Sequence, residues 1–198
     1  MTATAVERPL TPAARRILAV AGDLFYERGI HTVGVDLIAR EAGVTKKTIY
    51  DRFGSKEALV VAYLRHRDQR WRAFMIDRLR RVDDRYARVL AVFDALEEWE
   101  AAWDRGCAMV NAYAELSDPA HPGRAVARDQ KAWTVELFAQ LLDDAGVRGA
   151  PMLADQLLVL HEGAVVATHV GGRDSAVTVA RAAARALLAA AANPGTSA

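Results

Sequence analysis

The chain has 198 residues, a formal net charge of +1 and one cysteine, Cys107, and 52% of its residues are hydrophobic. This composition supports a substantial core and excludes wholesale disorder, a polycationic protein and a disulfide within the chain. No apolar run approaches the roughly 20 residues of a membrane span, and the N-terminus lacks a signal-peptide-like stretch. A cytoplasmic protein with no membrane partner is therefore expected.

Apolar residues recur at helical spacing almost throughout, so the sequence predicts an all-α protein of about nine helices. Capping residues, glycines and prolines mark the expected ends of the helices. In chain order the helices are expected at residues 12–28, 35–42, 46–53, 56–80, 84–104, 107–116, 122–145, 151–170 and 176–192. Residues 1–9 and 193–198 are expected to be disordered.

The segment VDLIAREAGVTKKTIYDRF, residues 35–53, has the pattern of a helix-turn-helix. Ala39 is small where two crossing helices must nearly touch, and Gly43 suits the left-handed conformation that ends the first helix. Ile38, Val44 and Ile49 are the apolar residues expected to hold the pair against the preceding helix. An ordinary turn between two packed helices has the same spacing, so the pattern alone does not establish DNA binding.

The second helix of this pair carries a local positive charge. Residues 44–56 contain four basic side chains and one acidic side chain, as a DNA-binding patch requires in a nearly neutral chain. The start of the helix is expected to face the major groove, and Lys56 is expected to meet a phosphate at the start of the next helix. The candidate DNA contacts are Thr45, Lys46, Lys47, Thr48, Tyr50 and Lys56.

Residues 13–64 resemble the DNA-binding domain of the tetracycline-repressor (TetR) family, above all in IAREAGV (38–44) and TIYDRFGSKEAL (48–59). The resemblance implies a three-helix DNA-binding domain, placed here at 10–55, and a helical ligand-binding and dimerisation domain at 56–192. It also implies DNA contacts at the six residues named above. Gly34 departs from the threonine common there in the family, so no side-chain phosphate contact is expected at that position.

In this family the ligand pocket is usually lined by the long fourth helix and its neighbours. An apolar effector is expected, because large aromatic side chains are frequent on those helices. Each of these side chains could instead pack in the core. Cys107 is expected to be a small buried hydrophobe rather than a redox sensor. The candidate ligand-binding residues are Trp71, Phe74, Phe93, Trp103, Asn111, Trp133 and His161.

The resemblance further implies a homodimer formed through the last two helices, near 152–170 and 175–192. Two recognition helices related by a two-fold axis would read palindromic operator DNA. Because the sequence has no metal-ligand spacing and no catalytic motif, we expect no catalytic residue, metal or cofactor.

The sequence therefore predicts a ligand-responsive transcriptional regulator, a repressor that a small molecule releases from its operator. One alternative is a helical small-molecule-binding protein or enzyme that does not bind DNA specifically. Another is an activating or architectural DNA-binding protein with no ligand. Sequence-specific DNA binding would exclude the helical ligand-binding protein or enzyme. Release from DNA by a small molecule would then distinguish the ligand-responsive regulator from a DNA-binding protein with no ligand.

Overall fold

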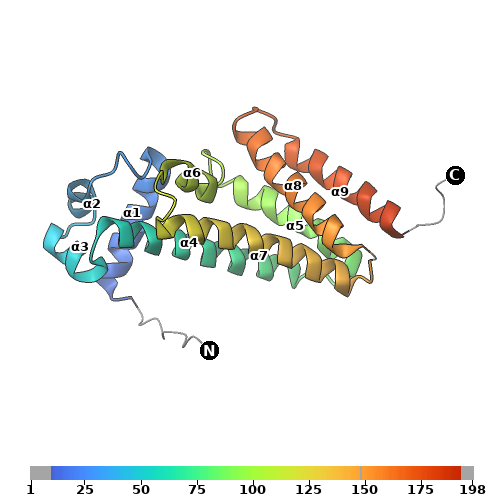
Figure 1. Ribbon diagram of the computed structural model, residues 1–198, viewed down its shortest axis with the longest axis horizontal. Helices are drawn as coiled ribbons and strands as arrows, with labels where there is room; N and C mark the ends of the chain where they lie inside the picture. The colour runs from blue at the N-terminus through green and yellow to red at the C-terminus, as the bar shows by residue number, and fades with distance from the viewer. Residues whose placement is uncertain (1–9, 148, 193–198) are drawn as a thin grey trace.

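The computed structural model describes residues 10–147 and 149–192, and the predicted disorder of 1–9 and 193–198 lies outside them. Within the described residues the chain forms nine helices and no strand, so the predicted all-α fold is confirmed. Figure 1 shows α1 to α3 at one end of an elongated molecule, with α4 leading from them into the larger bundle. The helices are α1 (Pro12–Arg28), α2 (Val35–Glu41), α3 (Lys46–Phe53), α4 (Lys56–Leu79), α5 (Arg85–Glu100), α6 (Ala108–Glu115), α7 (Pro122–Asp144), α8 (Ala150–His169) and α9 (Ala176–Ala192).

Three of the predicted caps have the geometry that starts a helix. The hydroxyl of Thr11 accepts a hydrogen bond from a backbone amide in the first turn of α1 at 3.3 Å, and Thr45 and Ser55 do the same for α3 and α4 at 3.1 and 3.0 Å. Each bond satisfies one of the amides that have no partner inside the helix. These side chains therefore fix where α1, α3 and α4 begin.

The smaller core lies around α1, α2 and α3. Ile17, Ala21, Ile38 and Ile49 are fully buried there. The same cluster includes residues beyond the predicted boundary at 55/56, from the first turns of α4, from α6 and from the start of α7. The N-terminal helices are thus packed directly on α4, while the domain boundary itself stays a prediction.

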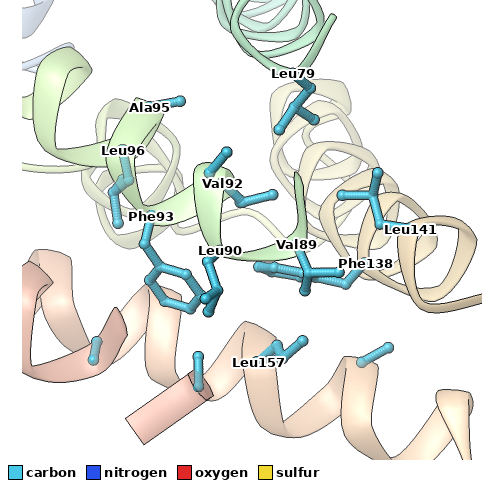
Figure 2. Close-up of a cluster of buried hydrophobic side chains, with 14 of the residues drawn as sticks. Leu79, Val89, Leu90, Val92, Phe93, Ala95, Leu96, Phe138, Leu141 and Leu157 are labelled. Atoms are coloured by element: carbon cyan, nitrogen blue, oxygen red, sulfur yellow. The ribbon is translucent and has the colours of Figure 1, made fainter. Parts of the chain in front are cut away.

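The larger core is built by α4, α5, α7, α8 and α9. Figure 2 shows side chains of α5, α7 and α8 meeting at its centre, with Leu90 and Phe93 on the side of α5 that faces Leu157. Phe93 and Phe138 are fully buried, and their ring centroids lie 5.9 Å apart. Figure 1 shows α8 and α9 side by side along one flank of this bundle.

The predicted end of α5 near residue 104 is wrong, because the helix ends at Glu100. The backbone amides of Ala102 and Trp103 bond to carbonyls three residues earlier, which tightens the chain into turns. The Glu100 carboxylate is held by His169 at 2.6 Å, and the Trp103 ring packs edge-on against Tyr26. These long-range contacts override the helical preference of the intervening alanines.

No helix among the described residues is long and apolar enough to cross a membrane. Within the same residues, no group of three or more histidine, cysteine or acidic side chains is arranged to hold a metal ion.

Gly43 has the predicted left-handed conformation, with φ of 61°. We expect Gly43→Val to lower the free energy of unfolding by about 1–2 kcal/mol, because a branched side chain disfavours this conformation. The cost is conformational, since a Cβ added at Gly43 meets no atom within 4 Å. Urea unfolding measures the change, and Gly43→Asn is the control, because asparagine tolerates a positive φ. Equal losses in the two variants would contradict this explanation.

Candidate DNA-binding face and buried cavity

The turn between α2 and α3 presents α3 on the surface. The Val44 amide donates to the Ala39 carbonyl at 3.0 Å, and the Arg16 guanidinium donates to the Ala42 carbonyl at 2.9 Å. Ile49 is the one buried residue of α3. Arg16 is a positioning residue that the sequence does not reveal, because it lies on α1, far from the turn in the chain.

The predicted DNA contacts on α3 lie together at its exposed face. Lys46, Lys47 and Tyr50 are exposed, and the hydroxyls of Thr45 and Thr48 are 2.9 Å apart. Thr45 combines two roles here, since its hydroxyl also caps the helix. The arrangement brings two ammonium groups, two hydroxyls and a phenol to one end of a short helix.

Both lysines of this face pair with acids in the protein alone. Lys46 Nζ lies 2.6 Å from Asp36 Oδ1, and Lys47 Nζ lies 2.8 Å from Asp51 Oδ2. The side-chain hydrogen bond to Asp36 raises the pKa of Lys46 above its ordinary value. Exposed pairs of this kind contribute little to stability, because water and salt screen them, so phosphates can replace the carboxylates at little cost.

Lys56 is placed differently from the residues of α3. It is the first residue of α4 and is half-buried, and burial lowers its pKa while the charge of Glu115 acts in the opposite direction. Glu115 also accepts a hydrogen bond from the His31 amide at 3.0 Å. This α6 carboxylate thus ties the loop after α1 to the larger bundle beside the start of α4.

A small cavity lies inside the bundle among α4, α5, α6, α7 and α8. Its volume is about 40 Å³, room for only a few water molecules. Its walls combine aromatic, polar and charged side chains, among them Arg67, Trp71, Trp99, Gln130, Lys131 and His161. A drug-sized molecule requires roughly 300 Å³ or more, so this cavity would have to enlarge to hold one.

Two of the predicted ligand-binding residues, Trp71 and His161, line the cavity, with ring centroids 6.0 Å apart. Phe74 lies behind the wall, where its ring stacks on Trp71 at 6.4 Å. Phe93 belongs to the core, although its ring centroid lies 6.3 Å from that of His161. The structure therefore gathers these four residues in one region of the bundle and exposes two of them to the cavity.

The other three predicted residues lie apart from the cavity walls. The ring of Trp103 packs against Tyr26 of α1 at 5.1 Å, near the DNA-binding end. The Asn111 side-chain amide donates to the Arg105 carbonyl at 2.8 Å. The Arg72 guanidinium lies over the Trp133 ring, 4.9 Å from the ring centroid, and Trp133 packs against the edge of the larger core. These residues have structural contacts that account for their positions.

The charged groups of the wall were missed by sequence reasoning. Lys131 Nζ lies 2.7 Å from Glu162 Oε2 and donates to Cys107 Sγ at 3.3 Å. Cys107 is therefore partly buried beside an ammonium group rather than enclosed in hydrocarbon alone. A lysine and a glutamate far apart in the sequence look like surface residues, and only the packing of α7 on α8 reveals the pair.

Burial opposes ionisation of Glu162, but a hydrogen bond from His161 and the charge of Lys131 outweigh it and lower the Glu162 pKa to about 2. The unfolded value is about 4.3. A depressed carboxyl pKa contributes stability above the unfolded pKa, and this stability is lost as the pH falls through the folded pKa.

We therefore expect Glu162→Gln to lower the free energy of unfolding by roughly 2–3 kcal/mol near pH 7. The deficit should shrink as the pH falls from about 4.3 toward the folded value of about 2. Urea unfolding at several pH values measures it. Glu98→Gln is the control, because Glu98 forms an exposed ion pair with Arg78 and should change stability little. A deficit independent of pH would contradict the assignment.

Three buried polar atoms around the cavity have no hydrogen-bond partner among the described residues. They are Trp71 Nε1, Gln130 Oε1 and His161 Nε2. Buried polar groups are normally paired, and leaving one unpaired costs free energy. An indole donor, an amide acceptor and an imidazole nitrogen around one cavity indicate a place for a polar molecule.

An exposed helix-turn-helix at one end of a helical bundle is typical of a DNA-binding transcriptional regulator. Residues 17–63 match the family model described as bacterial regulatory proteins, tetR family. A TetR-family transcriptional regulator from Streptomyces coelicolor superposes with a TM-score of 0.84 at 30% identity, over 90% of this chain and 95% of that one. A TetR-type regulator from Streptomyces avermitilis gives 0.72 at 30% identity, over 89% and 99%.

The chain therefore belongs to the TetR family of transcriptional regulators. Among curated proteins, the HTH-type transcriptional activator FasR of Mycolicibacterium smegmatis is 34% identical over 80 residues. That match spans 40% of this chain and 36% of FasR, so it covers little more than a third of the curated relative.

Proposed function

We propose that this regulator is a cytoplasmic, ligand-responsive repressor that binds palindromic operator DNA as a homodimer and is released by a small, largely apolar effector. The observation that carries the proposal is the exposed face of α3. Lys46, Lys47 and Tyr50 lie there on a helix held by a buried Ile49 and a left-handed Gly43. Thr45, Thr48 and Lys56 complete the proposed contacts to base edges and phosphates.

An exposed apolar surface on α8 and α9 supports the proposed dimer. Among the described residues, five of the ten exposed large hydrophobic side chains lie on these two helices or at the end of α8. Met152, Val159 and Val166 recur every seven residues, so they lie on one face of α8. A second copy of the chain is the proposed occupant, because two-fold pairing would also place two α3 helices on one duplex. The residues are Met152, Val159, Val166, Val170 and Val179.

The course of α4 supports the proposed release by a ligand. Leu59 and Leu64 near its start belong to the core of the DNA-binding end, while Trp71 lines the cavity two turns further on. An effector that enlarges the cavity by moving α4 would therefore shift a helix that packs directly on α1 and α3. It releases DNA only if it binds the DNA-free arrangement better than the DNA-bound one.

A gel-shift experiment with DNA from immediately upstream of the protein's own gene and from neighbouring promoters tests the proposal. We expect a discrete complex that the same DNA competes away and random DNA does not, with an affinity that falls steeply with salt. Repression is then tested with a reporter gene behind the bound fragment. Only nonspecific binding to every fragment would favour the alternative of a helical ligand-binding protein or enzyme.

A further inference from the structure

We infer that the cavity takes a small organic anion, such as a carboxylate with a compact apolar body, and that Arg67 binds its charge. The inference rests on the proposed function, in that it names the chemical class of the effector. It also assigns Arg67 a second role, because the same guanidinium contacts the DNA-binding end of the molecule.

Arg67 is a largely buried cation with no ion-pair partner among the described residues. Its residue is only 8% exposed, and its guanidinium has no hydrogen bond or ion pair with any of the described residues. The contacts are aromatic instead, at 3.9 Å from the ring centroid of Trp103, 4.7 Å from Tyr26 and 5.7 Å from Trp99. Ring faces attract a cation but do not replace the hydrogen bonds that water gives to a guanidinium.

The carboxylates of the same walls are already paired. Asp68 lies 2.8 Å from Arg72, and Glu162 lies 2.7 Å from Lys131. Glu100 Oε2 lies 2.6 Å from a ring nitrogen of His169. Each of these carboxylates therefore already has a hydrogen-bond partner, whereas the guanidinium of Arg67 has none among the described residues and is open to an anionic ligand.

One of the three unpaired neutral groups, the Trp71 indole, fits the same class of ligand, and the other two are acceptors that require a donor group. Trp71 Nε1 can only donate a hydrogen bond, so it requires an acceptor, and a carboxylate oxygen is a strong one. His161 Nε2 and Gln130 Oε1 leave places for a further polar group on the ligand. Apolar side chains such as Leu96 and Val165 line the rest of the wall and suit a compact hydrocarbon body.

Arg67 also connects the cavity to α1. Its guanidinium lies over the ring of Tyr26, whose hydroxyl donates to the Gly106 carbonyl at 3.1 Å and accepts from the Arg105 amide at 2.9 Å. Tyr26 thereby ties the end of α1 to the loop between α5 and α6. An anion that draws Arg67 toward the cavity weakens its contacts with Tyr26 and Trp103, and so loosens the packing of the DNA-binding end on the bundle.

Three probes of nearly equal size and different charge test the inference: benzoate, benzamide and benzylamine. Tryptophan fluorescence reports binding, because Trp71 and Trp99 line the cavity, and a thermal-shift assay gives an independent measure. We expect saturable binding of benzoate that is at least about tenfold tighter than binding of either other probe, since tenfold corresponds to one modest charge-assisted contact. Equal binding of the three probes, or no saturable response to benzoate, would overturn the inference.

Arg67→Met tests the residue. It should weaken benzoate binding by about tenfold or more and abolish the preference over benzamide, while Arg65→Met, on an exposed position of the same helix, should change neither. If Arg67→Met does not fold by circular dichroism, Arg67→Lys takes its place. It keeps the charge but loses the planar fork, so it should retain the preference for benzoate with weaker binding. Unchanged benzoate binding in the folded Arg67 variant would overturn the assignment.

The same samples separate this inference from the proposed function. Charge-selective binding that depends on Arg67 supports the anion site, whether or not the protein binds DNA specifically. If benzoate then leaves operator affinity unchanged in the intact protein, the coupling through Tyr26 is overturned while DNA recognition by α3 stands. If the protein binds no DNA specifically, the regulator proposal fails and the anion site is judged by the fluorescence and thermal data alone.

Discussion

The double variant Lys47→Ala, Tyr50→Ala is expected to lose operator binding while keeping its helical content. The Lys47 side chain is 82% exposed and Tyr50 is 46% exposed, so their removal leaves the packing of α3 unchanged. Loss of one phosphate contact and one base-edge contact should cost about 2–5 kcal/mol of binding, at least 30-fold in affinity. Fluorescence anisotropy with labelled operator measures the affinity, and circular dichroism measures the helix content.

Arg80→Ala is the matched control for this variant. Arg80 is an exposed cation at the far end of α4, so its loss changes the net charge without touching the proposed DNA-binding face. We expect near-normal operator affinity in this control. If the double variant also binds normally, α3 is not the recognition helix, and the DNA contacts implied by the family resemblance are wrong.

The second large effect is expected at the proposed dimer surface. Val159 and Val166 lie one heptad apart on α8 and are 70% and 53% exposed. Glutamates at both positions would place four carboxylates in a two-fold interface, where unpaired buried charge is strongly destabilising. We expect Val159→Glu, Val166→Glu to be monomeric by sedimentation velocity and to bind the operator at least about 100-fold more weakly, because one α3 reads only half of a palindrome.

Ile76→Glu controls for the effect of a charge on an exposed hydrophobic position. Ile76 is 38% exposed on α4 and lies outside the proposed interface, so this variant should remain dimeric. A double glutamate variant that still sediments as a dimer would show that α8 does not form the interface. A monomeric variant with full operator affinity would show that DNA recognition does not need the dimer.

The DNA-binding end could be predicted from the sequence because its signals are local. Thr45 caps α3, and a threonine just before a predicted helix is recognisable as a cap from the sequence alone. The left-handed Gly43 lies only a few residues from the helix that it terminates. Ile38 and Ile49 are buried as their spacing indicates. Signals of this kind involve residues within one or two helical turns of each other, so they can be recognised without knowledge of the tertiary structure.

The cavity could be predicted only in part, because the groups that define it meet through tertiary packing. Aromatic residues at helical spacing pointed to Trp71 and His161, which do line it. The same reasoning selected Trp103, which instead packs against Tyr26 after α5 ends early. From the sequence alone, Arg67 and Lys131 look like solvated surface residues. The sequence does not show that aromatic rings surround the Arg67 guanidinium, or that Lys131 pairs with Glu162.

The most direct test of the account is selection of DNA from a random-sequence pool by the purified protein, followed by sequencing of the bound fraction. It requires no knowledge of where the operator lies. Two α3 helices related by a two-fold axis predict enrichment of an inverted repeat, and the enriched DNA should not be retained by the Lys47→Ala, Tyr50→Ala variant. A bound pool with no common motif, or an enriched motif that this variant binds equally well, would contradict sequence-specific recognition through α3.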